Sequence, residues 1–210
     1  MGSNSRQAAL RYELGEDHSY DFVNGPIPWE MDRELDQFVM GEEQTYAMCD
    51  PLSALSCIQA MENLENYIVA EGPYDGIMGF SQGANLSLSW MIKKQQEAKN
   101  GKEKQLPFKF GVFFSNPWGV YNAKALADGQ LVYLDNRTIE GLLDLPTAHI
   151  WGLADKDQAL AQMISTTCVE SKRSIFVHDR GHEIPPKIDT VISMAKIINR
   201  AIMQAQSMEF

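Results

Sequence analysis

The sequence predicts an α/β fold, a mostly parallel β-sheet with helices on both faces. Short apolar segments typical of buried strands alternate with longer segments whose apolar residues recur at helical spacing. One of the short segments runs directly into residues 79–83 (GFSQG), which place a serine at a strand-to-helix junction. The chain has 210 residues, of which 44% are hydrophobic and 22% charged, as in an ordinary globular domain. We therefore expect residues 1–210 to form a single domain.

The expected strands are short, rich in β-branched and aromatic residues, and mostly bounded by glycine, proline or polar turn residues. In chain order they are residues 20–23 (YDFV), 76–80 (GIMGF), 108–114 (FKFGVFF), 147–151 (TAHIW) and 174–178 (SIFVH). Strands that alternate with helices form parallel sheets whose two faces are both covered.

The expected helices lie between these strands and at the C-terminus. They are residues 51–71, 84–94 and 186–206. The first has apolar residues at helical spacing, and we expect Asp50 to cap it and Pro51 to open it. The last has an apolar stripe along one side, typical of a helix that packs on a sheet.

The composition excludes several classes of function. The net charge of −10 repels phosphate backbones and anionic lipid surfaces, so we expect no nucleic-acid or membrane partner. Three cysteines without CxxC spacing suggest neither a disulfide framework nor a zinc site, and we expect them to be reduced and buried. The N-terminus has no apolar core of a signal peptide, and no apolar run is long enough to span a bilayer. The sequence therefore predicts a cytoplasmic protein.

Residues 79–83 carry the strongest chemical signal. A serine on a sharp turn between strand and helix is held in a strained conformation, and glycine at both flanks lets the turn close. The helix that follows points its positive N-terminus at the serine, which favours negative charge that develops there. Ser81 is therefore the candidate nucleophile, and a plain tight turn is the alternative.

A serine nucleophile needs a histidine base that a carboxylate orients. Asp155 follows the strand 147–151 after a glycine turn, and His182 follows the strand 174–178 in a short loop. The order serine, acid, histidine is that of hydrolases with this type of sheet, and parallel strands bring their carboxyl ends to one edge. Asp157 is the alternative acid.

Other chemistry has little support in the sequence. His178 and His182 are four residues apart, but they do not lie on a helix and two prolines follow, so we expect no metal. There is no P-loop and no G-x-G-x-x-G motif, so we expect no nucleotide cofactor, and none of another kind is indicated.

Four segments, EGPYDGIMGFSQGANLSL, FKFGVFFS, HIWGLADKD and VHDRGHEIP, resemble the fungal serine hydrolase (FSH-type) family of α/β-hydrolases, and RYELGEDHSYDFVNGPIPWEMD resembles the segment around the second strand of that family. That family includes esterases and thioesterases found beside polyketide synthases, such as those of the citrinin and lovastatin pathways. The resemblance covers roughly residues 9–205. It implies that Ser81 is the nucleophile, Asp155 the acid and His182 the base, and that the amide of Gln82 belongs to the oxyanion hole.

One departure from the family concerns the sheet. The family opens with a strand of the type ILCLHG. This strand lies in the centre of the sheet, beside the strand that corresponds to residues 20–23, and the loop that follows it gives a second amide to the oxyanion hole. This chain begins after that strand, so the resemblance implies either an upstream piece missing from the gene model or a degenerate paralogue. We expect residues 20–23 to show a gap beside them or to close directly onto residues 76–80.

The resemblance implies a hydrolase that cleaves an ester or thioester of a polyketide-like acyl chain in secondary metabolism, with the acyl carrier of a synthase as a further partner. The alternatives are a catalytically impaired protein that binds an acyl ligand or a synthase, and an acyltransferase with the same triad. We expect residues 116–145 to form a cap or pocket wall, with Trp118, Val120 and Tyr121 facing the acyl group. An ordinary crossover with a buried tryptophan is the alternative for this segment.

Overall fold

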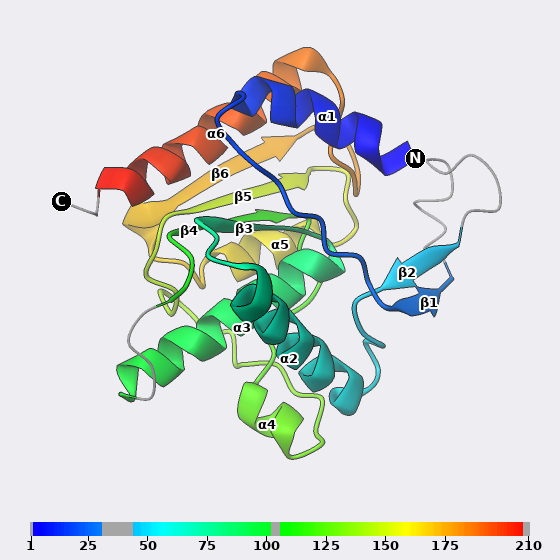
Figure 1. Cartoon of the computed structure of the whole chain (residues 1–210), viewed down its shortest axis with the longest axis vertical. Coiled ribbons are helices and arrows are strands. Elements are labelled where there is room, and N and C mark those ends of the chain that lie inside the picture. The colour runs from blue at the N-terminus through cyan, green and yellow to red at the C-terminus, as the bar shows by residue number, and fades with distance from the viewer. Residues whose placement is uncertain (1, 31–43, 102–105, 208–210) are drawn as a thin grey trace.

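The computed structural model describes residues 2–30, 44–101 and 106–207. Its centre is a parallel sheet in the order β3 (Gly76–Phe80), β4 (Phe110–Phe114), β5 (Thr147–Gly152) and β6 (Arg173–His178) (Figure 1). The register places the last residues of neighbouring strands side by side, with Phe80 opposite Phe114 and Gly152 opposite His178. The predicted α/β fold with a parallel sheet is confirmed.

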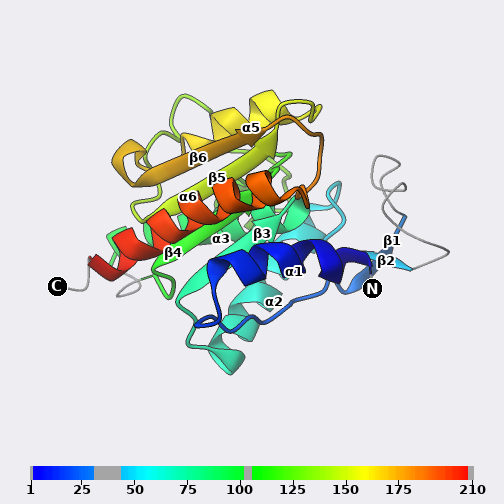
Figure 2. The same ribbon diagram turned by 90° about the horizontal axis from the view of Figure 1, so that it is seen from above.

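Helices cover both faces of this sheet (Figure 2). One face carries α1 (Gly2–Leu14) and α6 (Ile188–Ser207), which contact each other. The other face carries α2 (Ala54–Glu71), α3 (Gln82–Lys99) and α5 (Gln158–Ser165). None of the helices in the described part of the chain is long and apolar enough to cross a membrane.

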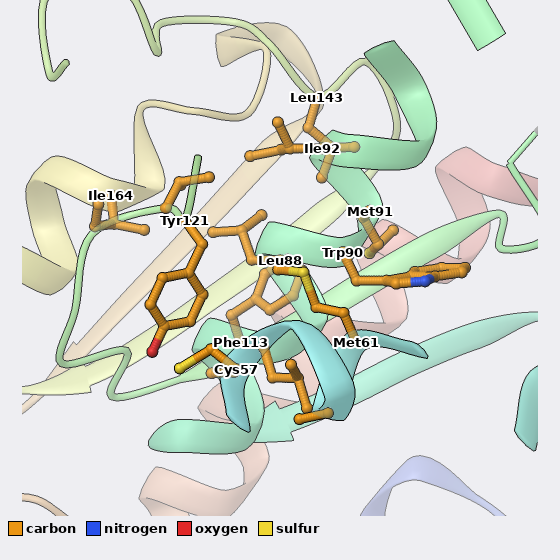
Figure 3. Packing of buried hydrophobic residues seen from close by; sticks show 14 of the residues in the cluster. Cys57, Met61, Leu88, Trp90, Met91, Ile92, Phe113, Tyr121, Leu143 and Ile164 are labelled. Atoms are coloured by element: carbon orange, nitrogen blue, oxygen red, sulfur yellow. The ribbon is translucent and has the colours of Figure 1, made fainter. Parts of the chain in front are cut away.

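Each face of the sheet has its own hydrophobic core, because side chains alternate along a strand. In β4, Phe113 packs on the side of α2 and α3, whereas Val112 and Phe114 pack on the side of α1 and α6. Figure 3 shows the first of these cores, where Trp90 and Met61 lie close to Phe113. Full burial of one such side chain stabilises a fold by about 1.5–3 kcal/mol.

Several small elements complete the chain. Strands β1 (Ile27–Trp29) and β2 (Thr45–Ala47) form an antiparallel pair, and the segment 116–145 contains only the short helix α4 (Ala123–Ala127). A 3₁₀ turn (Glu170–Lys172) precedes β6. The sequence analysis predicted none of these, nor α1 and α5.

Residues 20–23 do not form a strand, and that prediction is wrong. The segment is irregular and mostly exposed, and side chains hold it: Tyr74 Oη donates to Asp21 Oδ2 at 2.6 Å, and the Arg11 guanidinium lies over the Phe22 ring at 5.3 Å. Two outcomes were expected for residues 20–23, a gap beside them or closure onto residues 76–80, and the closure is absent in the described part of the chain. Among the described strands β3 pairs only with β4, so β3 is an edge of the sheet.

The start of α2 also differs from the prediction. The helix begins at Ala54, and the cap is Ser53, whose Oγ accepts from the Ser56 amide at 3.2 Å. Asp50 lies in the preceding turn, where its amide donates to Ser56 Oγ at 2.9 Å. A serine hydroxyl accepts from the third amide of a helix as well as a carboxylate does, so Ser53 takes the role that was predicted for Asp50.

Candidate active site

Ser81 lies on the turn between β3 and α3 in a conformation that few residues adopt. Its φ is 53° and its ψ is −120°. Such a backbone costs about 1–3 kcal/mol and persists only where the surroundings hold it. Here the Ser81 amide donates to the Phe114 carbonyl at 2.9 Å, and the Ser81 carbonyl accepts from the Asn85 amide at 3.1 Å. The sheet and the helix thus fix the serine from both sides.

The two glycines that flank Ser81 differ in their role. A Cβ at Gly79 would lie 2.6 Å from the Ala84 nitrogen, so only glycine lets the helix start this close to the strand. A Cβ at Gly83 would meet nothing within 4 Å. The expectation that both glycines are needed to close the turn therefore holds for Gly79 alone.

The structure brings together the three residues that the sequence singled out. His182 Nε2 lies 2.9 Å from Ser81 Oγ, and His182 Nδ1 lies 2.8 Å from Asp155 Oδ2. A neutral imidazole with its proton on Nδ1 donates to the carboxylate and accepts from the serine hydroxyl. The backbone amide of Asp157, the alternative acid, donates a hydrogen bond to Asp155 Oδ1 at 3.0 Å. The imidazole is thus oriented by Asp155.

Asp155 is ionised although it is buried. Its side chain is only 1% exposed. Burial, the largest single influence, raises the pKa of Asp155, but the hydrogen bonds from His182 and from the Asp157 amide together bring that pKa below its usual value. A carboxylate at this position favours a positive charge on the imidazole whenever His182 takes up a proton.

The loops that carry Asp155 and His182 are joined by backbone contacts. The Leu153 amide donates to the His178 carbonyl at 2.7 Å, and the Ala154 amide donates to the Arg180 carbonyl at 3.1 Å. A Cβ at Gly152 would lie 2.0 Å from the Arg180 carbonyl oxygen, so glycine is required for this close approach. The distance from acid to base is therefore set by main chain rather than by flexible side chains.

The second histidine of this loop has a different environment. His178 Nδ1 accepts from the Arg180 amide at 3.2 Å, and burial lowers the pKa of His178, which keeps the ring neutral. No group of three or more histidine, cysteine, aspartate or glutamate side chains in the described ranges is placed to hold a metal ion.

Gln82 contributes more than the sequence indicated. Its amide is the first of α3 and so has no acceptor within the helix. Its side-chain Oε1 accepts from the Met48 amide at 2.6 Å, and its Nε2 donates to the Cys49 carbonyl at 2.8 Å. Sequence reasoning missed this contact, since no local pattern links residues more than 30 positions apart.

A cavity of about 440 Å³ lies beside the segment 116–145. Its lining combines aromatic and aliphatic side chains with a polar turn: Trp118, Gly119, Tyr133, Leu134, Asp135, Asn136, Arg137, Leu160 and Met163. Asn85, one helical turn after Ser81, donates through Nδ2 to the carbonyls of Trp118 at 3.2 Å and Gly119 at 2.7 Å. The wall of the cavity is thereby tied to the helix that carries the nucleophile.

Of the three residues predicted for the pocket, Trp118 lines this cavity. Val120 and Tyr121 are not among the lining residues, and both are buried in the core with α2 and α3, as Figure 3 shows for Tyr121. The Tyr121 ring stacks on the ring of Tyr133, which lines the cavity, with their centres 5.3 Å apart. Tyr121 therefore supports the cavity wall from the side of the core.

The fold and this site define a serine hydrolase of the α/β-hydrolase type. A solved structure, YahD with malic acid, superposes with a TM-score of 0.50 at 15% identity over 92% of this chain and 85% of its own, which establishes the fold. The family model described as "Serine hydrolase (FSH1)" matches residues 3–194, and the chain belongs to this family.

Several curated relatives are fungal esterases. Esterase FPY3 of Fusarium mangiferae is 32% identical over an alignment of 214 positions, which covers 98% of this chain and 94% of the relative. The probable esterase tazC of Aspergillus terreus is 29% identical over 92% of this chain and 86% of its own length. These matches support an esterase with a small-molecule ester as substrate.

Proposed function

We propose that this chain hydrolyses an ester or thioester of a polyketide-like acyl chain through Ser81, His182 and Asp155. The observation that carries the proposal is the continuous set of contacts from Ser81 Oγ through the imidazole to the Asp155 carboxylate, at 2.9 and 2.8 Å. A serine hydroxyl held in this way loses its proton to the histidine as it attacks a carbonyl carbon.

In the first half of the reaction Ser81 Oγ bonds to the acyl carbon, and His182 Nε2 takes the hydroxyl proton. The carbonyl oxygen, on which negative charge develops, accepts a hydrogen bond from the Gln82 amide, and Asp155 stabilises the imidazolium. His182 then gives its proton to the departing alcohol or thiol, which leaves an acyl-enzyme. In the second half water attacks this ester with the same base, and the free acid leaves.

We further propose that the cavity beside residues 116–145 receives the acyl chain; its lining includes none of Ser81, Asp155 and His182, and it is linked to the nucleophile helix through Asn85. A volume of about 440 Å³ lies in the range of small-molecule sites, and most of its side chains are apolar. We place the acyl chain against Trp118, Tyr133 and Met163. An ester with a small alcohol and a thioester on the acyl carrier of a polyketide synthase would present the same acyl group to this site.

The test is hydrolysis of p-nitrophenyl esters from two to twelve carbons, and of N-acetylcysteamine thioesters with the same acyl groups. We expect turnover that Ser81→Ala abolishes, together with labelling by a fluorophosphonate that this variant also loses. Ser87→Ala, which changes a hydroxyl six residues further along α3, serves as the matched control and should retain activity. Equal turnover by wild type and Ser81→Ala would contradict the proposal.

The same assay separates the alternatives. A protein that only binds acyl ligands would show no turnover above the Ser81→Ala background. The position of β3 at the end of the sheet, among the strands that the structure describes, is the observation that favours this alternative. An acyltransferase would release acylated acceptor in place of free acid when an alcohol or amine competes with water.

A further inference from the structure

The side chain of Gln82 connects the nucleophile turn to a segment far away in the sequence. Its carboxamide binds the Met48–Cys49 main chain through both of its polar atoms. Oε1 accepts from the Met48 amide at 2.6 Å and from the Cys49 amide at 3.5 Å, and Nε2 donates to the Cys49 carbonyl at 2.8 Å. Nε2 also lies 3.4 Å from Cys49 Sγ. Two opposed hydrogen bonds leave the carboxamide no freedom to rotate.

The segment that Gln82 holds is itself anchored to α2. Cys49 is fully buried, with its Sγ at 3.6 Å from Cys57 Sγ in the first turns of α2. The next amide, that of Asp50, donates to Ser56 Oγ at 2.9 Å. The carboxamide of Gln82 is therefore fixed at its far end by a rigid partner rather than by a mobile loop.

The position of Gln82 matters because of the conformation of Ser81. The ψ of −120° at Ser81 sets the orientation of the planar peptide that joins Ser81 to Gln82, and the N–H of Gln82 belongs to that peptide. A residue with φ of 53° tends to relax unless its neighbours prevent this. The carboxamide contacts restrain the chain directly after the strained residue, so they restrain this N–H as well.

We infer that the Gln82 side chain is a positioning residue that aims the Gln82 amide at the oxyanion. This inference rests on the proposed function, in which that amide receives the charge on the carbonyl oxygen. An oxyanion donor contributes only when it is already in place as the charge develops, and loss of one donor lowers the rate by about 10²–10³-fold. Misalignment of the donor should lower the rate by part of that factor, because it weakens stabilisation of the transition state and leaves substrate binding unchanged.

Two variants of similar length test the inference. Gln82→Met removes all side-chain hydrogen bonds to the Met48–Cys49 segment. Gln82→Glu keeps the shape and the acceptor for the Met48 amide but sets a carboxylate against the Cys49 carbonyl. Gln95→Met is the matched control, because Gln95 lies on the same helix and its Oε1 accepts from the Asp144 amide at 3.1 Å. Turnover is counted per active site, titrated to completion with a fluorophosphonate, so that misfolded protein does not enter the result.

We expect both Gln82 variants to lower kcat by about 10- to 100-fold, a share of the loss of a whole donor, with KM within twofold of wild type. A trifluoromethyl ketone, which forms a tetrahedral adduct with the serine, should bind more weakly by the same factor. A role in folding alone would reduce the number of titrated sites and leave these two values unchanged. If Gln82→Met does not fold, Gln82→Glu carries the test.

Wild-type kcat per titrated site in either folded variant would overturn the inference, and so would a rise in KM with unchanged kcat. Ser81→Ala, measured in parallel, separates this outcome from failure of the proposed function. If Ser81→Ala is inactive while the Gln82 variants match wild type, only the role of the carboxamide is wrong. If Ser81→Ala retains full turnover, the proposed function itself is wrong.

Discussion

Mild acid should destabilise this protein through His149, a histidine with no part in the site. His149 lies in the middle of β5, is 3% exposed, and packs with its ring centre 5.2 Å from that of Phe113. Its Nε2 is buried and has no hydrogen-bond partner among the described residues. Burial, followed by the positive charge of Arg173, lowers the pKa of His149 to about 3.

The size and the sign of the effect follow from this pKa. Between pH 6.5 and pH 3 the unfolded chain binds a proton at this position and the folded chain does not, so acid favours unfolding. Each pH unit in that window costs about 1.4 kcal/mol, which amounts to about 2 kcal/mol between pH 7 and pH 5. His178 acts in the same direction, since burial lowers its pKa too. Asp155 does not contribute there, because its pKa lies below its usual value and its stabilisation is lost only as the pH falls further.

Urea unfolding of the wild type and of His149→Leu at pH 7 and pH 5 measures the effect. We expect the wild type to lose about 2 kcal/mol more of its free energy of unfolding on acidification than the variant does. His18→Leu is the matched control, because His18 is exposed, and it should follow the wild type. An equal loss in the wild type and in His149→Leu would refute the assignment of this effect to the buried imidazole.

Four further predictions concern the site and the thiols. Gly152→Ala should lower both activity and the free energy of unfolding, the latter by about 1–3 kcal/mol, because its Cβ would lie 2.0 Å from a carbonyl oxygen. Gly83→Ala, where a Cβ would meet nothing within 4 Å, should keep activity and raise the free energy of unfolding by about 0.5–1 kcal/mol. Activity assays and urea titrations of both glycine variants measure these effects. Asp155→Asn should lower kcat about 10⁴-fold without unfolding the protein, as steady-state kinetics and circular dichroism would show, because an amide cannot hold the imidazole in the productive tautomer. The three cysteines are at most 1% exposed, so mass spectrometry should find none alkylated by iodoacetamide in the native protein and all three after unfolding.

The site could be located from the sequence because its three residues each follow a strand. Parallel strands end at one edge of a sheet, so Ser81, Asp155 and His182 had to lie near one another once the strands 76–80, 147–151 and 174–178 were recognised. The catalytic role of the three stays a prediction until the variants are measured. The contacts that hold the site could not be found in this way, since Gln82 and Asn85 bind main chain at positions that no periodicity links to them.

The errors in the fold have a related cause. Residues 20–23 have the composition of a strand, but a strand exists only where a neighbour pairs with its backbone, and composition does not reveal the neighbour. The reverse holds for α1, a helix with a weak apolar pattern, where Leu10 and Leu14 pack into the core shared with α6. In both cases the tertiary partner, rather than the local residues, decides the structure.

The first turn of α3 joins the separate parts of the site. Ser81 at its start contacts His182, the Gln82 carboxamide holds the Met48–Cys49 main chain, and Asn85 holds the wall of the cavity at Gly119. Five consecutive residues thus connect the base, the expected oxyanion amide and the proposed acyl pocket. Because these connections share one rigid turn, a substitution that moves the start of α3 should change turnover and acyl selectivity together. A substitution at the far wall, on α5, should change acyl selectivity alone.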